Sequence, residues 1–183
     1  MKNKVVIITG GSAGIGAAAA RLFAQRGTKL VLVGRRAEPL ETLAAELSAQ
    51  TQVLTIAADV GERSQWATIF EKSQTHFGRI DALINNAGLH RRGNVADNQC
   101  DDLVEMMDVN LTAPIALSRL VIPYLREAGG GAIVNVASLA GFTPIQGAAT
   151  YAAGKAGLRA FSYSLADELR DEGIHVGLVC PGP

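Results

Sequence analysis

Three residues in the last third of the chain have the types and spacing of a proton-transfer site. Tyr151 and Lys155 are four residues apart in a segment with helical periodicity, so both side chains should project from one face about one turn apart. A phenol holds its proton firmly at neutral pH, but an ammonium about 5 Å away stabilises the phenolate by about 3 kcal/mol at an effective dielectric of about 20. Ser138 follows an apolar segment, and its hydroxyl can hold a substrate oxygen. This combination predicts acid–base chemistry on an alcohol or a carbonyl group.

A glycine-rich segment near the N-terminus has the pattern of a phosphate-binding turn. Residues Thr9–Gly16 read TGGSAGIG and lie between an apolar run and a helical segment. Glycines at positions 10, 14 and 16 would let the backbone approach a pyrophosphate, whose charge would lie at the helix N-terminus. Ala17 and Ala18 follow where a nucleotide triphosphatase would have lysine and serine or threonine. The turn therefore predicts dinucleotide binding.

Two arginines at the end of the second apolar run indicate which dinucleotide is bound. An acid at that place favours NAD(H), whereas an arginine accommodates the 2′-phosphate of NADP(H). The sequence is Gly34-Arg35-Arg36, and no acid occurs there before Glu38. We predict that NADP(H) is preferred over NAD(H), with Arg35 as the principal contact and Arg36 and Ser12 assisting it. The alternative is that both arginines are solvated charges at the start of a helix.

Short apolar runs alternate with helical segments, and this alternation must position the residues above. Nearly unbroken, mostly β-branched runs are typical of parallel strands covered on both faces. Six strands are expected, at Lys4–Thr9, Lys29–Gly34, Val53–Ala57, Ile80–Asn85, Ala132–Ala137 and His175–Cys180. Helical periodicity marks Ile15–Arg26, Leu40–Ala49 and Tyr151–Asp171. The pattern predicts a doubly wound parallel sheet in a three-layer α/β fold, with residues 1–183 forming a single domain.

Composition and charge argue against several classes of protein. The 183 residues include 17 Lys+Arg and 17 Asp+Glu, and this balance disfavours nucleic acid or an acidic membrane surface as a partner. No apolar run approaches the roughly 18 residues of a membrane span, and the N-terminus does not resemble a secretion signal. Cys100 and Cys180 are far apart, so we expect neither a disulfide scaffold nor a metal site. These features indicate a cytoplasmic protein.

Taken together, the motifs resemble those of the short-chain dehydrogenase/reductase family. The resemblance extends from Val5 through Gly182. Thr9–Gly16 is similar to the family's TGxxxGIG turn, and residues 85–88 are similar to its NNAG motif. Asp59 and Val60 resemble its adenine-side pair, and Pro181-Gly182 resembles the start of its nicotinamide-side turn. The family's catalytic tetrad corresponds to Asn110, Ser138, Tyr151 and Lys155.

The resemblance implies a Rossmann fold and the interconversion of a secondary alcohol with a ketone or aldehyde, with Tyr151 as the acid/base. It also implies that Lys155 grips the nicotinamide ribose and that Asn110 holds a water that continues the proton relay. A homodimer or homotetramer would form through the helices around Asn110–Arg126 and Tyr151–Asp171. The cofactor would contact Gly10, Ser12, Gly14, Ile15, Gly16, Arg35, Arg36, Asp59, Val60, Asn86, Ala87, Gly88, Tyr151, Lys155, Pro181 and Gly182.

Several of these residues also have structural explanations. Asp59 could cap the helix that follows it. The amides of Asn85 and Asn86 should brace neighbouring strands and the cofactor site. Residues 90–92 (HRR) and 142–145 (FTPI) should line or approach the substrate site. The first set is basic and the second apolar, so the two do not agree on one class of substrate.

Three other functions agree less well with these residues. A serine hydrolase is rejected because Val136 and Ala140 occupy the glycine positions of a GxSxG elbow around Ser138. An NADP(H)-binding regulator or redox sensor would keep the fold without efficient catalysis, yet the serine, tyrosine and lysine are all present. Epimerases, dehydratases and enoyl reductases of this type usually differ in glycine spacing or have a wider Tyr–Lys gap.

The expected position of the last strand bears on whether the chain continues beyond Pro183. A sheet in the order 3-2-1-4-5-6 would place His175–Cys180 at an edge, without the lysine, proline or bulge that usually protects one. By the resemblance, a substrate-covering loop, a helix and a seventh strand would follow Pro181-Gly182. We therefore expect that the sequence omits a C-terminal segment; the alternative is a truncated, aggregation-prone chain.

Overall fold

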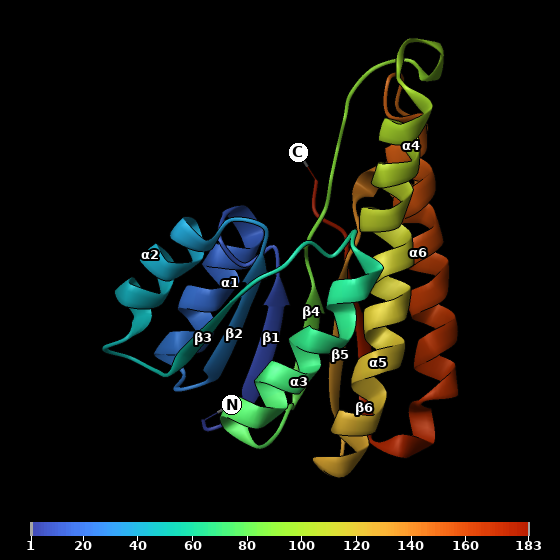
Figure 1. Ribbon diagram of the computed structural model, residues 1–183. Helices are drawn as coiled ribbons and strands as arrows, with labels where there is room; N and C mark the ends of the chain where they lie inside the picture. Colours follow the sequence, from blue (N-terminus) through green and yellow to red (C-terminus); the bar gives the residue numbers. More distant parts are fainter. Residues whose placement is uncertain (1, 183) are drawn as a thin grey trace.

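The computed structural model describes residues 2–182, which contain a parallel sheet flanked by helices (Figure 1). The strands are β1 (Val5–Thr9), β2 (Lys29–Gly34), β3 (Val53–Ala57), β4 (Ala82–Asn85), β5 (Gly131–Val136) and β6 (Ile174–Val179). All neighbours pair in parallel, in the order β3-β2-β1-β4-β5-β6. The direction in which strands are added reverses between β3 and β4, and α/β sheets bind ligands outside the strand ends at such a switch point.

Helices cover both faces of this sheet. They are α1 (Gly14–Gln25), α2 (Ala37–Leu47), α3 (Trp66–Phe77), α4 (Cys100–Met107), α5 (Ala113–Glu127) and α6 (Ala149–Glu168). A π-helical turn, η3 (Asp108–Thr112), joins α4 to α5, and a 3₁₀ turn, η4 (Leu139–Gly141), follows β5. Figure 1 shows α4 rising beyond the C-terminal ends of the strands. Among residues 2–182, no helix combines the length and the apolar character needed to cross a membrane.

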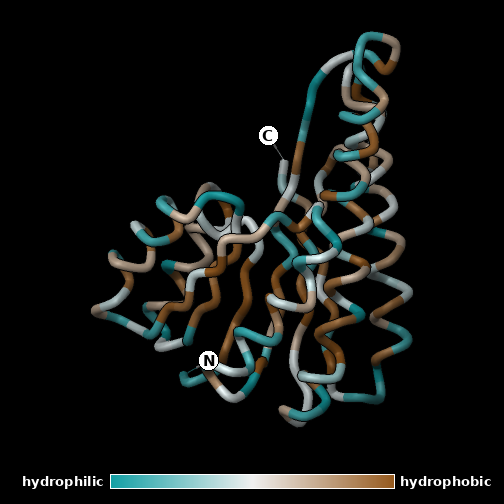
Figure 2. Tube along the Cα trace, viewed as in Figure 1, coloured by the Kyte–Doolittle hydropathy of each residue, from teal (hydrophilic) through white to brown (hydrophobic). Residues whose placement is uncertain are grey.

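The apolar strands divide their side chains between two cores. Val5 and Ile7 of β1 are fully buried in a core with residues of α3, α5 and α6. Val6 and Ile8 point to the other face and are buried against α1 and α2. Figure 2 shows hydrophobic colour concentrated along the strands. Burial on both faces explains why the strands have almost no polar alternation, and it confirms the predicted three-layer α/β fold.

The expected element boundaries differ little from those observed. Every expected strand is present, with each end within two residues of its expected position. Helix α2 begins at Ala37 rather than Leu40, because Pro39 lies in the first turn, where its missing N–H is not needed. Helix α6 ends at Glu168, and a separate 3₁₀ turn, Arg170–Glu172, completes the expected helical segment.

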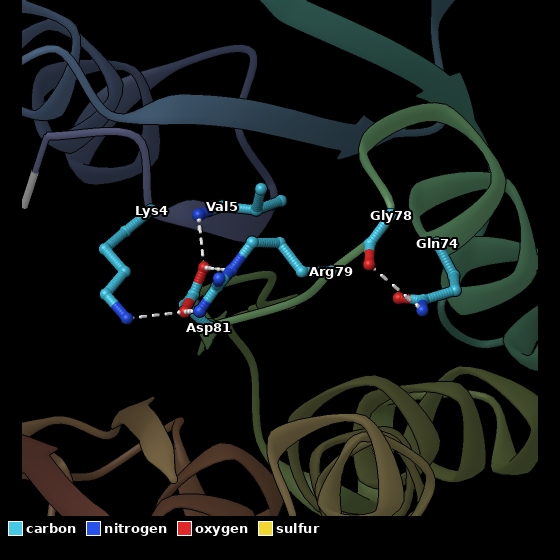
Figure 3. Close-up of polar contacts among 6 residues, drawn as sticks. All are labelled: Lys4, Val5, Gln74, Gly78, Arg79 and Asp81. Carbon is cyan, nitrogen blue, oxygen red and sulfur yellow. Dashed lines mark hydrogen bonds and ion pairs between the residues drawn. The ribbon is translucent and has the colours of Figure 1, made fainter. Parts of the chain in front are cut away.

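A buried carboxylate joins the first residue of β1 to the start of β4 (Figure 3). Asp81 is 6% exposed and accepts hydrogen bonds from the Val5 N–H (2.8 Å), Lys4 Nζ (2.9 Å) and Arg79 Nη2 (2.6 Å). Burial alone would raise the pKa of Asp81. The hydrogen bonds from Arg79, Val5 and Lys4 outweigh burial and hold the pKa below its usual value. This anchor lies at the N-terminal edge of the sheet, opposite the strand ends where a ligand would bind.

Candidate functional site

The turn after β1 is packed so closely that glycine is required at two positions. Gly10 has a φ of +64°, and a Cβ there would lie 2.9 Å from the Cα of Ala87. A Cβ on Gly16 would lie 2.3 Å from the carbonyl oxygen of Gly10. Helix α1 begins at Gly14 after an extended Ala13, and among residues 2–182 no side chain caps it. Its first N–H groups are therefore left for an anionic ligand.

The segment after β4 is fastened to this turn. Asn86 Nδ2 donates to the carbonyl oxygens of Thr9 (2.9 Å) and Gly10 (3.1 Å). The N–H groups of Asn86 and Ala87 both donate to Thr9 Oγ1 at 3.0 Å. Asn85 points into the core, where its Nδ2 donates to Asn135 Oδ1 on β5 at 2.9 Å. Both asparagine amides thus brace neighbouring strands, as expected.

A hollow of about 270 Å³, here called the Arg35 hollow, lies at the ends of β1, β2 and β3. Arg35 and Arg36 line it and are exposed, and neither has a hydrogen-bond or ion-pair partner within residues 2–182. Asp59 also lines it, and its Oδ1 accepts from the Gly61 N–H at 2.9 Å, so it stabilises a turn rather than capping α3. The other lining residues are Gly10, Ser12, Ala13, Gly34, Ala58, Val60, Ala87, Gly88, Leu89 and Val109.

A second hollow of about 450 Å³, the Lys155 hollow, continues from the first. The two share Gly10, Ala13 and residues 87–89. It also takes in Gly14, Ile15, Asn86, His90, Val136, Ala137, Ser138, Tyr151, Lys155, Pro181 and Gly182. Every predicted catalytic or cofactor-binding residue therefore lines one of these two hollows, except Gly16 and Asn110. Of the residues expected near the substrate, His90 lines the second hollow, whereas Arg91, Phe142 and Pro144 line neither.

Lys155 is the buried cation of the site. Its side chain is 3% exposed, and Nζ donates to the carbonyl oxygen of Val136 at 2.9 Å. Nζ lies 5.8 Å from the centroid of the Tyr151 ring. Burial lowers the pKa of Lys155 to about 8, with Cys180 acting in the opposite direction. The ammonium is held beside the phenol by a neutral acceptor, with no carboxylate among the hydrogen-bond and ion-pair partners found for it in residues 2–182.

Ser138 is brought to Tyr151 because the turn that follows it packs directly on α6. A Cβ on Gly141 of η4 would lie 2.9 Å from the backbone nitrogen of Ala156. Ser138 Oγ accepts from the Ala140 N–H at 3.1 Å, and the Leu139 N–H donates to the carbonyl oxygen of Pro181 at 3.0 Å. A hydroxyl, a phenol and an ammonium thus surround one cavity, where they can hold an oxygen and transfer a proton.

Asn110 has a different position from the other tetrad residues. It is fully buried in η3, and its Nδ2 donates to the carbonyl oxygens of Leu89 (2.6 Å) and Met106 (2.8 Å). Its Oδ1 accepts from the Leu89 N–H at 3.2 Å. Asn110 therefore holds the segment that follows residues 85–88, and it is not among the residues that line the two hollows. The π-helical turn that places it there has no periodicity signal by which the sequence could have predicted it.

His90 stacks on the Tyr151 ring, a contact that sequence reasoning did not assign. The two ring centroids are 4.3 Å apart and the planes are inclined by 23°. The only sequence signal was the position of His90 two residues after the NNAG segment. His90 also lines a third hollow of about 580 Å³, the Arg92 hollow, which adjoins the second at Ser138, Tyr151, Pro181 and Gly182.

Comparisons with known proteins agree with this geometry. Residues 4–183 match the short chain dehydrogenase family. An uncharacterised oxidoreductase of Staphylococcus epidermidis is 35% identical, over 100% of this chain and 78% of its own length. Sulfoacetaldehyde reductase 2 of Chromohalobacter salexigens is 39% identical, over 98% of this chain and 72% of its own length.

A solved structure has the same fold with a bound dinucleotide. An NAD⁺-bound xylitol dehydrogenase superimposes with a TM-score of 0.94 at 28% identity, over 99% of this chain and 70% of that one. The residues gathered here fit such a cofactor. The glycine turn, the start of α1 and the two arginines line adjoining hollows, and within the described part of the chain neither that helix start nor those arginines have a side-chain partner. The chain therefore belongs to the short-chain dehydrogenase family and is an NAD(P)-dependent oxidoreductase.

Proposed function

We propose that the protein interconverts a secondary alcohol and its ketone, or an aldehyde and its alcohol, with a preference for NADP(H). The observation that supports this most directly is that Ser138, Tyr151 and Lys155 line one cavity with the glycine turn. Bound nicotinamide would supply the hydride for reduction or accept it in oxidation. No metal takes part in the proposed reaction.

The side chains would divide the remaining chemistry among them. Ser138 Oγ holds the carbonyl oxygen, and Tyr151 Oη donates its proton to that oxygen as the carbon is reduced. Negative charge develops on the oxygen, so hydroxyl donors aimed at it stabilise the transition state more than the ground state. Lys155 Nζ places positive charge beside the phenol and favours its deprotonated form. In oxidation the same proton returns to Tyr151.

A water held by Asn110 would reload Tyr151 with a proton. Asn110 Nδ2 is engaged with two carbonyl oxygens, whereas Oδ1 accepts from only one N–H in the described residues 2–182. A carbonyl oxygen can accept two hydrogen bonds. The second acceptor position of Oδ1 is therefore the place where Asn110 would bind the relay water.

The cofactor would be held along both of the first two hollows. Its pyrophosphate fits the N-terminus of α1 and the turn residues Gly10, Gly14, Ile15 and Gly16, with Ser12 beside them. Arg35 would bind a 2′-phosphate with Arg36 assisting, and Asp59 and Val60 would lie toward the adenine. The nicotinamide end would lie among Asn86, Ala87, Gly88, Tyr151, Lys155, Pro181 and Gly182.

We also propose that the protein forms a homodimer or homotetramer through the helical segments around α5 and α6. Large apolar or aromatic side chains are exposed on them: Ile115 is 38% exposed and Tyr163 is 60% exposed. A cytoplasmic location fits the two free thiols, Cys100 and Cys180.

Replacement of the proposed proton donor tests the reaction. Tyr151→Phe should reduce NADPH-dependent turnover of carbonyl compounds to background, because the ring remains and only the transferable proton is lost. NADPH affinity, measured by fluorescence titration, should remain near that of the wild type. Retained turnover in Tyr151→Phe would contradict the assignment.

A further inference from the structure

The Arg92 hollow brings together residues of the proposed reaction centre, a charged side chain and several apolar side chains. Ser138 and Tyr151 line both this hollow and the Lys155 hollow. Arg92 and His90 supply the polar side, and among the described residues 2–182 that line it none is acidic. Four apolar side chains also line it and are here called the apolar wall: Leu139, Ala140, Ile145 and Ala148. Thr143, Pro181 and Gly182 complete the lining.

Two adjacent arginines in the loop after β4 have different surroundings. Arg91 is paired with Asp102, 3.3 Å away, and with Glu105, and it does not line this hollow. Arg92 lines the hollow, is exposed, and has no hydrogen-bond or ion-pair partner among the residues that the structure describes. Of these two arginines, Arg91 is thus neutralised by acidic partners, whereas Arg92, which lines the same hollow as Tyr151, has none among the described residues 2–182.

Backbone pairing fixes the place of Arg92. The N–H of the next residue, Gly93, donates to the carbonyl oxygen of Gly147 at 2.9 Å. The stem of Arg92 packs beside Gly147, where a Cβ would lie 3.7 Å from Arg92 Cγ. The loop after β4 is therefore fastened to the segment that leads into α6, which carries Tyr151. Arg92 and Tyr151 are held on the same hollow by the fold.

We infer that the substrate is a carbonyl compound, or the corresponding alcohol, that carries an oxoanion such as a carboxylate. The anion would pair with the Arg92 guanidinium while the reacting oxygen lies at Ser138 and Tyr151, and the carbon chain would lie along the apolar wall. The guanidinium suits this role because its planar donors match a carboxylate. The inference rests on the proposed function: hydride and proton add across the C=O bond, and the oxoanion takes no part in the bond changes.

The test compares ω-oxo acids of increasing chain length with their uncharged methyl esters, with NADPH as reductant. For the best chain length, kcat/KM of the acid should exceed that of the ester by about tenfold, the effect of one charge-assisted hydrogen bond. In Arg92→Gln the ratio should fall toward one. Arg91→Gln is the matched control, since it removes the same charge one residue away, and the ratio should stay as in the wild type. Added salt should lower the wild-type ratio.

Failure of the inference and failure of the proposed function give different results. If Tyr151-dependent turnover occurs but acid and ester react equally well, or if Arg91→Gln lowers the ratio as much as Arg92→Gln, the oxoanion site is wrong and the proposed reaction stands. If neither compound is reduced, calorimetric binding of an unreactive dicarboxylate, succinate, decides the matter. Binding that is lost in Arg92→Gln alone supports the oxoanion site without the reaction, and absence of binding to the wild type overturns the site.

Discussion

The proposed reaction uses Lys155 as a buried cation, but burial of a charge destabilises the folded chain. The Lys155 ammonium is buried, and its hydrogen-bond acceptor in the described residues 2–182 is a neutral group, the carbonyl oxygen of Val136. Burial is the reason that its pKa falls to about 8. A charge in this position can assist Tyr151, but the folded protein must tolerate it at neutral pH.

The sign of this effect can be tested with Lys155→Met. Between pH 8 and 10.5 the unfolded chain holds a proton that the folded chain has released, so for this group stability rises with pH across that window. Below pH 8, the buried charge destabilises the folded chain by up to about 3 kcal/mol. Lys155→Met removes this cost but also loses the hydrogen bond to Val136, which stabilises the wild type by about 1 kcal/mol. Urea unfolding at pH 7 should show Lys155→Met about 2 kcal/mol more stable than the wild type, although inactive, and the difference should shrink toward pH 10. A variant that is less stable at both pH values would contradict the account.

The predicted preference for NADP(H) over NAD(H) depends on Arg35. It is exposed on its hollow and unpaired within residues 2–182, so a 2′-phosphate would meet a free guanidinium there. Arg35→Asp should weaken NADPH binding relative to NADH by at least about tenfold, because a carboxylate repels the phosphate and can accept from a ribose hydroxyl. Titrations of both cofactors against the wild type, Arg35→Asp and Arg26→Asp as a distant control would show this. An unchanged preference would place the 2′-phosphate contact elsewhere.

At the scale of single residues, the sequence can predict a role that depends on spacing within one helix or strand. Tyr151 and Lys155 lie on one helix, so their proximity followed from helical geometry. The His90 stack on Tyr151 joins residues 61 positions apart, and nothing local encodes it. Asn110 was identified as a site residue by resemblance, but its bonds to Leu89 depend on the π-helical turn, which the sequence did not reveal.

At the scale of elements, β4 is held at both of its ends. Asn85 and Asn86 join its C-terminal end to β5 and to the turn after β1. Asp81, just before its first residue, accepts from the first N–H of β1. The strands themselves were predictable because burial on both faces leaves a continuous apolar run. The polar anchors could not be predicted from the sequence, because the strand order decides which residues far apart in sequence become hydrogen-bond partners.

Asp81→Asn tests the anchor at the N-terminal edge. The amide can still accept from Val5, but the charged hydrogen bonds with Arg79 and Lys4 weaken, and we expect a loss of about 2 kcal/mol in the free energy of unfolding at pH 7. The Asp81 pKa is lowered on folding, so this contribution is present above its usual pKa and disappears as the pH falls through the folded value. Glu46→Gln, which breaks an exposed ion pair with Arg21, should cost much less. Turnover per folded molecule should be unchanged, since Asp81 lies at the opposite edge of the sheet.

At the scale of the whole molecule, every strand of the sheet contributes to the two joined hollows at its C-terminal end. Gly10 follows β1, Arg35 follows β2, Asp59 follows β3, Ala87 follows β4 and Ser138 follows β5; Pro181 and Gly182 follow β6. Parallel pairing brings these ends to one edge, which is why residues spread over the entire sequence form one site. A ligand that fills both hollows would therefore contact both halves of the sheet.

Cofactor binding should consequently stabilise the chain as a unit. At a free NADPH concentration about 100 times Kd, the free energy of unfolding should rise by about 2.7 kcal/mol, and the melting temperature with it. Hydrogen exchange should slow in the segments after β1 and β2 and also after β5 and β6, because one ligand spans them. Gly16→Ala should abolish these changes, since its Cβ would lie 2.3 Å from the Gly10 carbonyl oxygen and distort the turn. Protection confined to the turn after β1, with none near Ser138 or Pro181, would mean that the two hollows do not hold one ligand.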